Sequence, residues 1–165
     1  DTIACPFPGS TTKNDLIQRT DYAQSVGADL YLSLHNNAGK DLSGFEIYYP
    51  NDNYDDGEHE KGQAIAECIA EQLSGLGIDR LDVVSKNSDG DEDDDTHWYQ
   101  DGSRADYYSV IRNSKYRGIT GMIVEHAYLS NPYDAEAYLS SNEKLEALGI
   151  ADATGVAAYY GLRKS

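Results

Sequence analysis

The stretch Asp29-Leu-Tyr-Leu-Ser-Leu34, followed directly by His35, decides how the chain is expected to fold. It is a short apolar run with little charge, as expected of a strand inside a sheet. The run Ile119–Val124 (ITGMIV) has the same character, whereas Gly44–Tyr49 (GFEIYY) alternates better and is expected nearer an edge. A fourth candidate strand, Thr2–Cys5, is cut short by the prolines that follow it.

Segments with helical patterns separate these runs. The first begins at Thr12. The others are expected at Glu58–Leu73, Ala105–Ser114, Asn131–Leu139 and Glu143–Tyr160. The second has Ile65, Ile69 and Leu73 at a spacing of four, which is typical of one buried helix face. Strands that alternate with helices predict a layered α/β domain with a largely parallel sheet.

Composition narrows the range of functions. The chain has 165 residues, which suits one domain, and 13 Lys+Arg against 29 Asp+Glu give a net charge of −16. Such an acidic chain is not expected to bind nucleic acid or an anionic membrane surface, because both need clustered cations. We find no apolar run of the ~18 residues that a membrane span needs. The two cysteines are too few for a disulfide framework.

Two residues have the position of site residues. In open α/β sheets, sites form beyond the carboxyl ends of strands. His35 follows one predicted strand there, and Glu125 follows another. A carboxylate directly after an apolar run is partly desolvated and usually needs a partner or a chemical role. The alternative is structural: His35 would cap its strand by hydrogen bonds, and Glu125 would pair with an arginine.

The remaining histidines and the helical cysteine are weaker candidates. His59 is expected to be solvated on the first turn of an acidic helix, and His97 to be a loop residue without chemistry. His126 should point to the face opposite Glu125 and pack there, because side chains alternate along a strand. Cys68 falls within the helical pattern and is expected in the core.

An acidic insertion is expected at residues 87–106, inside the domain. Its run Asp89–Asp95 has acids at every second position, as calcium loops do, but it lacks the glycine at the sixth position and has Gln100 at the twelfth. A solvated acidic loop is the default interpretation, and weak calcium binding is the alternative.

Several blocks of the sequence resemble one enzyme family. They are Asp15–Arg19 (DLIQR), Gly27–Ala38 (GADLYLSLHNNA), Gly44–Tyr49 (GFEIYY), Ser109–Arg112 (SVIR) and Met122–Pro132 (MIVEHAYLSNP) with Asp134 beyond. In the same order, the zinc-dependent N-acetylmuramoyl-L-alanine amidases (amidase type 3) read "L..R...A...GADL.IS.H.NA", "G.EVYY", "VLR" and "VLVE.GFLSNP.D". The resemblance covers nearly the whole chain except the acidic insertion.

The resemblance implies a twisted, mostly parallel sheet with helices on both faces, a three-layer α/β/α domain. It implies a peptidoglycan hydrolase, an autolysin or endolysin outside the cell at the cell wall. Such an enzyme cleaves the amide between N-acetylmuramic acid and L-alanine of the stem peptide. His35 matches a zinc-binding histidine of the family, and Glu125 matches the catalytic base. Zinc is the implied cofactor and the muropeptide the implied partner, with no nucleic acid and no membrane insertion; the oligomeric state stays open.

One part of the family pattern has no counterpart here. The family begins with a strand ending in a "GHGG"-type turn and a glutamate on the next helix, which supply two more zinc ligands. Asp1–Cys5 resembles the family's second strand, so residues 1–165 are expected to be one amidase-like domain without its first strand and helix. The alternative function is a metal-free cell-wall-binding or regulatory module on the same scaffold. A calcium-stabilised structural domain is a third possibility, which rests on the acidic loop alone.

Overall fold

The computed structural model describes residues 3, 13–39, 41–90 and 97–162. Its helices and strands are α1 (Lys13–Ser25), β1 (Leu30–Asn37), β2 (Phe45–Tyr49), α2 (Asp56–Gly75), β3 (Arg80–Ser85), α3 (Ser109–Lys115), β4 (Thr120–Tyr128), α4 (Pro132–Asp134), the π-helical turn η2 (Ala135–Leu139) and α5 (Asn142–Tyr159). The strand expected at residues 2–5, except for Ile3, and the helix start expected at Thr12 lie outside the described residues.

The strands form one sheet in the order β1-β4-β2-β3. The pairs β1–β4 and β2–β3 are parallel, and β2–β4 is antiparallel. The expected α/β fold with a mostly parallel sheet is therefore confirmed, with one antiparallel pairing at its centre. The edge strand β3 was not predicted, because its sequence RLDVVS mixes charged and apolar residues and only Val83 is buried.

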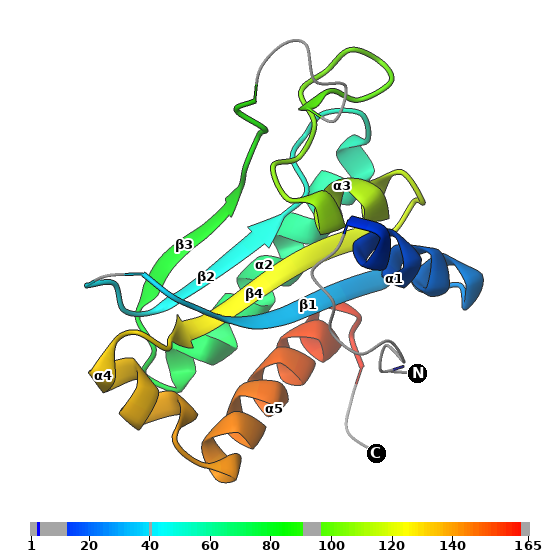
Figure 1. The fold of residues 1–165 in the computed structure, drawn as a ribbon. Helices are drawn as coiled ribbons and strands as arrows, with labels where there is room; N and C mark the ends of the chain where they lie inside the picture. Colours follow the sequence, from blue (N-terminus) through cyan, green and yellow to red (C-terminus); the bar gives the residue numbers. More distant parts are fainter. Residues whose placement is uncertain (1–2, 4–12, 40, 91–96, 163–165) are drawn as a thin grey trace.

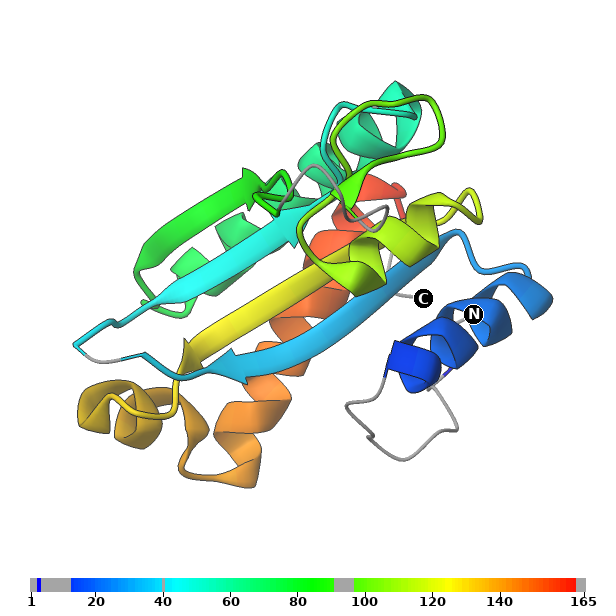
Figure 2. The same ribbon diagram turned by 45° about the horizontal axis from the view of Figure 1, so that its top comes forward.

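Helices cover both faces of the sheet, as expected. Figure 2 shows α3 in front of the sheet and α2 and α5 behind it. Alternation along β4 supplies both layers: Met122 and Val124 join the core against α2 and α5, while Ile123 packs with residues of α3. In Figure 1, α1 lies beside β1 on the α3 side. No helix in the described ranges combines the length and the apolar character needed to cross a lipid bilayer.

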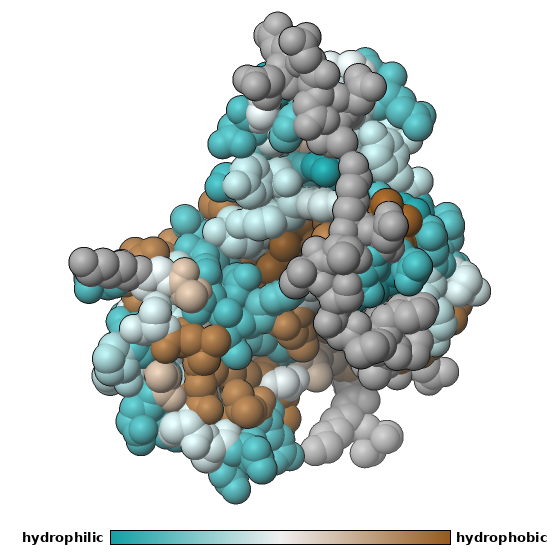
Figure 3. All heavy atoms as spheres, in the orientation of Figure 1, coloured by the Kyte–Doolittle hydropathy of each residue, from teal (hydrophilic) through white to brown (hydrophobic). Residues whose placement is uncertain are grey.

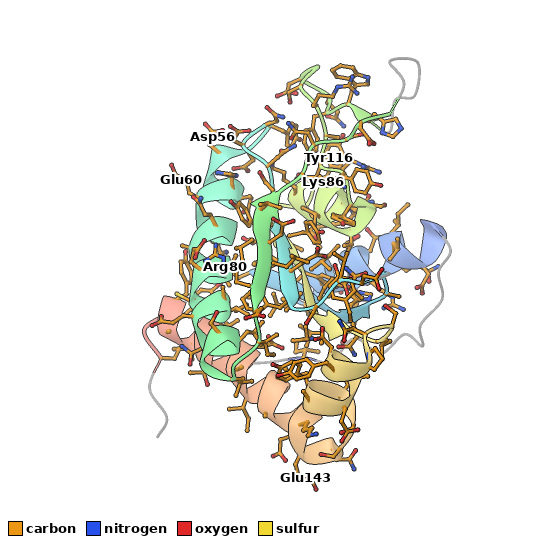
Figure 4. The ribbon with its side chains drawn as sticks, turned by 90° about the vertical axis from the view of Figure 1, so that its left-hand side faces the viewer. Asp56, Glu60, Arg80, Lys86, Tyr116 and Glu143 are labelled. Carbon is orange, nitrogen blue, oxygen red and sulfur yellow. The ribbon has the colours of Figure 1, made fainter. Side chains whose placement is uncertain are left out.

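The helix α2 follows the predicted pattern closely. Asp55 caps it by accepting hydrogen bonds from the backbone N–H groups of Gly57 and Glu58. Ile65, Ile69 and Leu73 are fully buried. On its outer side, Figure 4 shows Arg80 of β3 facing this helix, where its guanidinium binds the carboxylate of Glu67 through two hydrogen bonds of 2.7 Å.

The described ends of the acidic insertion are anchored rather than solvated. Backbone hydrogen bonds join Ser88 N to Ala105 O (2.9 Å) and Tyr107 N to Lys86 O (2.8 Å). These bonds hold residues 105–107 extended, so α3 begins at Ser109, four residues later than predicted. Asp106 is 1% exposed. The acidic run itself lies largely within residues 91–96, outside the described part of the chain.

A buried ammonium group joins this insertion to the rest of the fold. Lys115 lies at the end of α3 and is 1% exposed. Its Nζ donates to the backbone oxygen (2.7 Å) and the side-chain oxygen (2.9 Å) of Asn51, and it lies 3.6 Å from the carboxylate of Asp106. The Asp106 carboxylate also accepts a hydrogen bond from the hydroxyl of Tyr99. The cluster fixes the loop after β2 against α3.

Candidate active site

The two predicted site residues lie side by side in the sheet. His35 of β1 is paired in register with Glu125 of β4, and Glu125 is paired in turn with Glu46 of β2. Residues directly opposite each other on neighbouring strands point to the same face. An imidazole and two carboxylates therefore form a row across three strands, on the face that carries α1 and α3.

The His35 ring has a hydrogen-bond partner two residues earlier on the same strand. The hydroxyl of Ser33 lies 2.7 Å from Nε2 of His35. Although His35 is exposed overall, desolvation lowers the pKa of its imidazole, and the positive groups of Arg19 and His126 lower it further. The lowered pKa therefore favours the neutral form of the ring at pH 7. A neutral imidazole with one nitrogen held by a hydroxyl can bind a metal ion through the other.

Glu125 is a half-buried carboxylate that forms no ion pair with the described residues. Its Oε2 is buried and has no hydrogen-bond partner among the described residues. Burial, and then repulsion by Glu46, raise the pKa of Glu125 to about 7. The alternative that Glu125 pairs with an arginine is wrong for the described chain, where it forms no ion pair. A carboxylate with a pKa near the working pH is suited to act as a general base.

Glu46 was not predicted as a site residue. It is 7% exposed, and its Oε2 accepts hydrogen bonds from Nδ2 of Asn37 (2.8 Å) and from the hydroxyl of Tyr48 (3.1 Å). Asn37 also lies within 3.3 Å of the hydroxyl of Tyr128. Alternation in GFEIYY places Glu46 and Tyr48 on one face, which is the signal that could have found this residue.

Tyrosine side chains continue the row away from Glu46. The rings of Tyr48 and Tyr108 lie 4.6 Å apart, and Tyr107 meets Tyr108 edge to face at 5.0 Å. The ammonium of Lys86, labelled in Figure 4, lies 4.1 Å from the centre of the Tyr107 ring. Tyr107 is 41% exposed, so this end of the row is open to solvent.

The closing motif, the segment that follows Glu125 and ends at Asp134, holds the strands of the site together. Asp134 is fully buried and accepts hydrogen bonds from the hydroxyl of Ser43, from Gly44 N (3.0 Å) and from Tyr128 N (2.9 Å). It therefore ties the end of β4 to the segment that enters β2. Asn131 caps α4, because its side chain accepts hydrogen bonds from the backbone N–H groups of Tyr133 and Asp134.

The other candidate residues, three histidines and one cysteine, lie outside the row and have contacts that serve the fold. His59 is not simply solvated, since it is half-buried and its Nδ1 lies 2.8 Å from Pro50 O. His97 contacts the hydroxyl of Ser88 in the insertion. His126 is 6% exposed and packs on the α5 side, as predicted. Cys68 of α2 is only partly buried and does not join the core, contrary to the prediction.

The described residues do not bring a complete metal site together. Within the ranges that the structure covers, no group of three or more His, Cys, Asp or Glu side chains has metal-binding geometry. A catalytic zinc usually has three protein ligands. His35 suits one of them, and the others are not found in this part of the chain. The calcium interpretation of Asp89–Asp95 falls mainly outside the described residues and stays a prediction.

Comparison with known proteins places this geometry in a family. The family model for N-acetylmuramoyl-L-alanine amidase matches residues 8–158. Among solved structures, Cwp6 from Clostridium difficile is 21% identical with a TM-score of 0.70, over 93% of this chain and 21% of that chain. The catalytic domain of CwlV, an amidase from Bacillus (Paenibacillus) polymyxa var. colistinus, is 19% identical with a TM-score of 0.62, over 90% and 66%.

The catalytic domain of the endolysin CD27L, which targets Clostridia difficile, is 21% identical with a TM-score of 0.54, and the match covers 100% of this chain and 73% of that one. The chain thus spans less than two thirds of the length of the first two of these structures. No curated protein sequence matches. The family match runs through His35, Glu46, Glu125 and the closing motif, and the chain belongs to the N-acetylmuramoyl-L-alanine amidase family.

Proposed function

We propose that the chain is the main part of a catalytic domain that hydrolyses peptidoglycan outside the cell, at the cell wall. The bond cleaved is the amide between the lactyl group of N-acetylmuramic acid and L-alanine. One observation supports this above all. Glu125 has a buried oxygen without a hydrogen-bond partner in the described part of the chain and a pKa raised to about 7, next to the imidazole of His35 in the sheet.

Glu125 is assigned the proton transfers. As a carboxylate it accepts a proton from the attacking water, whose oxygen forms a bond to the lactyl carbonyl carbon. When the carbon–nitrogen bond breaks, the same group returns the proton to the nitrogen that leaves with L-alanine. The products are a free carboxylic acid on the sugar and a free amino terminus on the peptide. The negative charge of Glu46 raises the pKa of Glu125 and so helps Glu125 to keep the proton until the nitrogen leaves. Asn37 holds Glu46 in place by a hydrogen bond.

We propose zinc as the cofactor, with His35 as one ligand. A bound zinc ion would polarise the scissile carbonyl and acidify the water. The further ligands that the family resemblance implies upstream of Asp1 stay a prediction. The chain's own contribution is a neutral imidazole that Ser33 holds by one nitrogen.

His35→Ala tests the ligand. We expect zinc content, measured by elemental analysis of the purified full-length protein, to fall sharply while the circular dichroism spectrum is retained. His59→Ala is the matched control, because the His59 ring has a hydrogen-bond partner as well, the backbone oxygen of Pro50, but lies on α2 away from the row. Zinc content that is equal in the two variants would remove His35 from the site.

Glu125→Gln tests the base. The substitution keeps the side-chain shape and removes the proton acceptor, whose contribution is typically ~10²–10⁴-fold. We expect release of L-alanine amino termini from purified peptidoglycan to fall by at least about a hundredfold, with zinc content unchanged. Glu67→Gln, which alters a carboxylate on the outer side of α2, should keep its activity. A Glu125→Gln enzyme with more than about a tenth of the original turnover would contradict the assignment.

The metal-free wall-binding module remains the second candidate function. The tyrosine row that ends at the exposed ring of Tyr107 favours it, because tyrosine rings suit contact with sugars. Peptidoglycan binding without any release of amino termini, in zinc-loaded protein, would select the second function over the first.

A further inference from the structure

His126 connects the candidate site to the opposite side of the sheet. Its Nδ1 lies 3.0 Å from the backbone oxygen of His35, and its Nε2 lies 2.8 Å from Oδ2 of Asp152 in α5. The side chains of His126 and Asp152 are 8% and 5% exposed. In the family pattern "VLVE.GFLSNP.D" the position of His126 is not fixed, so this pair is additional to the motif.

The contact falls at an irregularity of the β1–β4 ladder. His35 is paired with Glu125, but Asn37 is paired with Tyr128, so β4 advances three residues where β1 advances two. Such a bulge interrupts the regular ladder and changes the direction of the side chains beside it. The backbone oxygen of His35 accepts from a side chain at this point. The direction of the His35 backbone therefore depends on where the His126 ring is held.

The two hydrogen bonds fix that ring in one orientation. A carbonyl oxygen can only accept, so Nδ1 of His126 must carry the hydrogen. Asp152 then binds the other end of the ring from the neighbouring helix, where Leu148 and Gly149 lie one turn before it. These residues and Leu34 line a pocket of about 190 Å³. Because this pocket leaves space beside the His126 ring, the two hydrogen bonds and not close packing fix the position of the ring.

The surroundings of the pocket are apolar. Figure 3 shows apolar side chains gathered over the first half of α5 and the nearby end of β1, where Leu34 and Leu145 are exposed and line the pocket. Polar groups in such a setting are costly unless they are paired. Loss of His126 would leave the His35 oxygen and the Asp152 carboxylate without this partner.

We propose that His126 and Asp152 are positioning residues, which set the direction of the His35 imidazole through its backbone from the opposite face of the sheet. The proposal rests on the proposed function in one respect, the role of His35 as a metal ligand. It predicts an effect on His35 even when no metal is bound.

The first test is metal-free. The histidines of the full-length protein are labelled with ¹⁵N, and the ring resonances of His35 are assigned from His35→Ala. We expect His126→Leu to shift and broaden the His35 ring resonances, and His126→Gln, which keeps an N–H donor, to restore them in part. His59→Leu is the matched control and should leave them unchanged. Unchanged His35 resonances in His126→Leu would overturn the proposal. Should that variant not fold, Asp152→Ala replaces it, with Asp152→Asn as the conservative partner.

The second test uses zinc alone, by competition with a chromogenic chelator. Loss of an outer partner of a metal ligand typically weakens binding 10–100-fold. We expect that loss in His126→Leu and no further loss when His126→Leu is added to His35→Ala. An equal loss in both backgrounds would show a general structural effect and overturn the proposal. If His35→Ala itself leaves zinc affinity unchanged, the proposed metal role fails, and the resonance test still decides the positioning role.

Discussion

The fold makes ionisation of the Glu125 carboxyl group unfavourable. Burial and the neighbouring charge of Glu46 raise its pKa from 4.5 to about 7, and the opposing effect of His126 is smaller. A raised carboxyl pKa favours the folded state below the unfolded-state pKa, and this advantage is lost as the pH rises through the folded-state pKa. The residue therefore opposes folding at neutral and alkaline pH.

Glu125→Gln should accordingly stabilise the metal-free protein at high pH. Glutamine does not ionise, so the gain over the original chain should grow between about pH 4.5 and 7 and then stay constant. We expect up to about 3 kcal/mol in the free energy of unfolding at pH 8. Urea unfolding at pH 5 and pH 8 measures it. Glu67→Gln should show no such gain, because its hydrogen bond to Arg80 lowers the pKa of Glu67. A Glu125→Gln variant that is less stable at pH 8 would contradict this account.

At this scale the sequence predicted the residues that follow the apolar runs and missed those that meet them across the sheet. The strands continue past His35 and Glu125, to Asn37 and Tyr128, so these two residues lie inside the strands and not beyond their ends. His35 and Glu125 each follow an apolar run, which is visible along the chain. Ser33 lies two residues before His35 on the same strand, so alternation puts it on the same face, but Glu46 meets Glu125 only through the pairing of β2 with β4, which no local pattern specifies. The partner of His126 is 26 residues away on α5, so packing could be predicted but Asp152 could not.

Among the elements, the contact between α2 and α5 depends on one glycine. The sequence suggests that Gly155 weakens its helix, since glycine is a poor helix former. In the structure a Cβ at this position would lie 2.6 Å from the Cα of Ile69 in α2. The two helices approach so closely because position 155 has no side chain.

Gly155→Ala and Gly149→Ala form a matched pair within α5. A Cβ at Gly149 would meet nothing within 4 Å, so this variant should gain up to about 1 kcal/mol in stability from helix propensity alone. Gly155→Ala has the same gain but must push α2 away, which typically costs about 1–3 kcal/mol. Thermal unfolding should therefore rank Gly149→Ala above the original chain and Gly155→Ala below it. The reverse order would show that the helices separate at little cost.

Elements with strong periodicity were the predictable ones. α2 and α5 lie within two residues of their expected bounds, because spacing and caps mark them. α3 was displaced, since the bonds of Ala105 and Tyr107 to the other end of the insertion are long-range. β3 was missed because an edge strand with alternating charges lacks the apolar run that marks β1 and β4.

For the whole molecule, charge is the property that bears most on function. Under the proposed function, a protein with a net charge of −16 must approach peptidoglycan, whose stem peptides carry carboxylates. Described cations near the tyrosine row are few, and Lys86 is held against the ring of Tyr107. Long-range repulsion should therefore oppose the first encounter, and contacts at the site must overcome it.

Salt should strengthen binding of this chain to the wall. Raising sodium chloride from about 10 mM to 150 mM shortens the range of charge interactions from about 30 Å to 8 Å and screens the repulsion. With Glu125→Gln, which prevents turnover, we expect the fraction of protein that sediments with purified peptidoglycan to rise over this range. Peptidoglycan with amidated carboxylates should show little dependence on salt, because one partner's charge is removed. Binding that falls steadily with salt would instead mean that a local cation such as Lys86 dominates the encounter, despite the acidity of the whole chain.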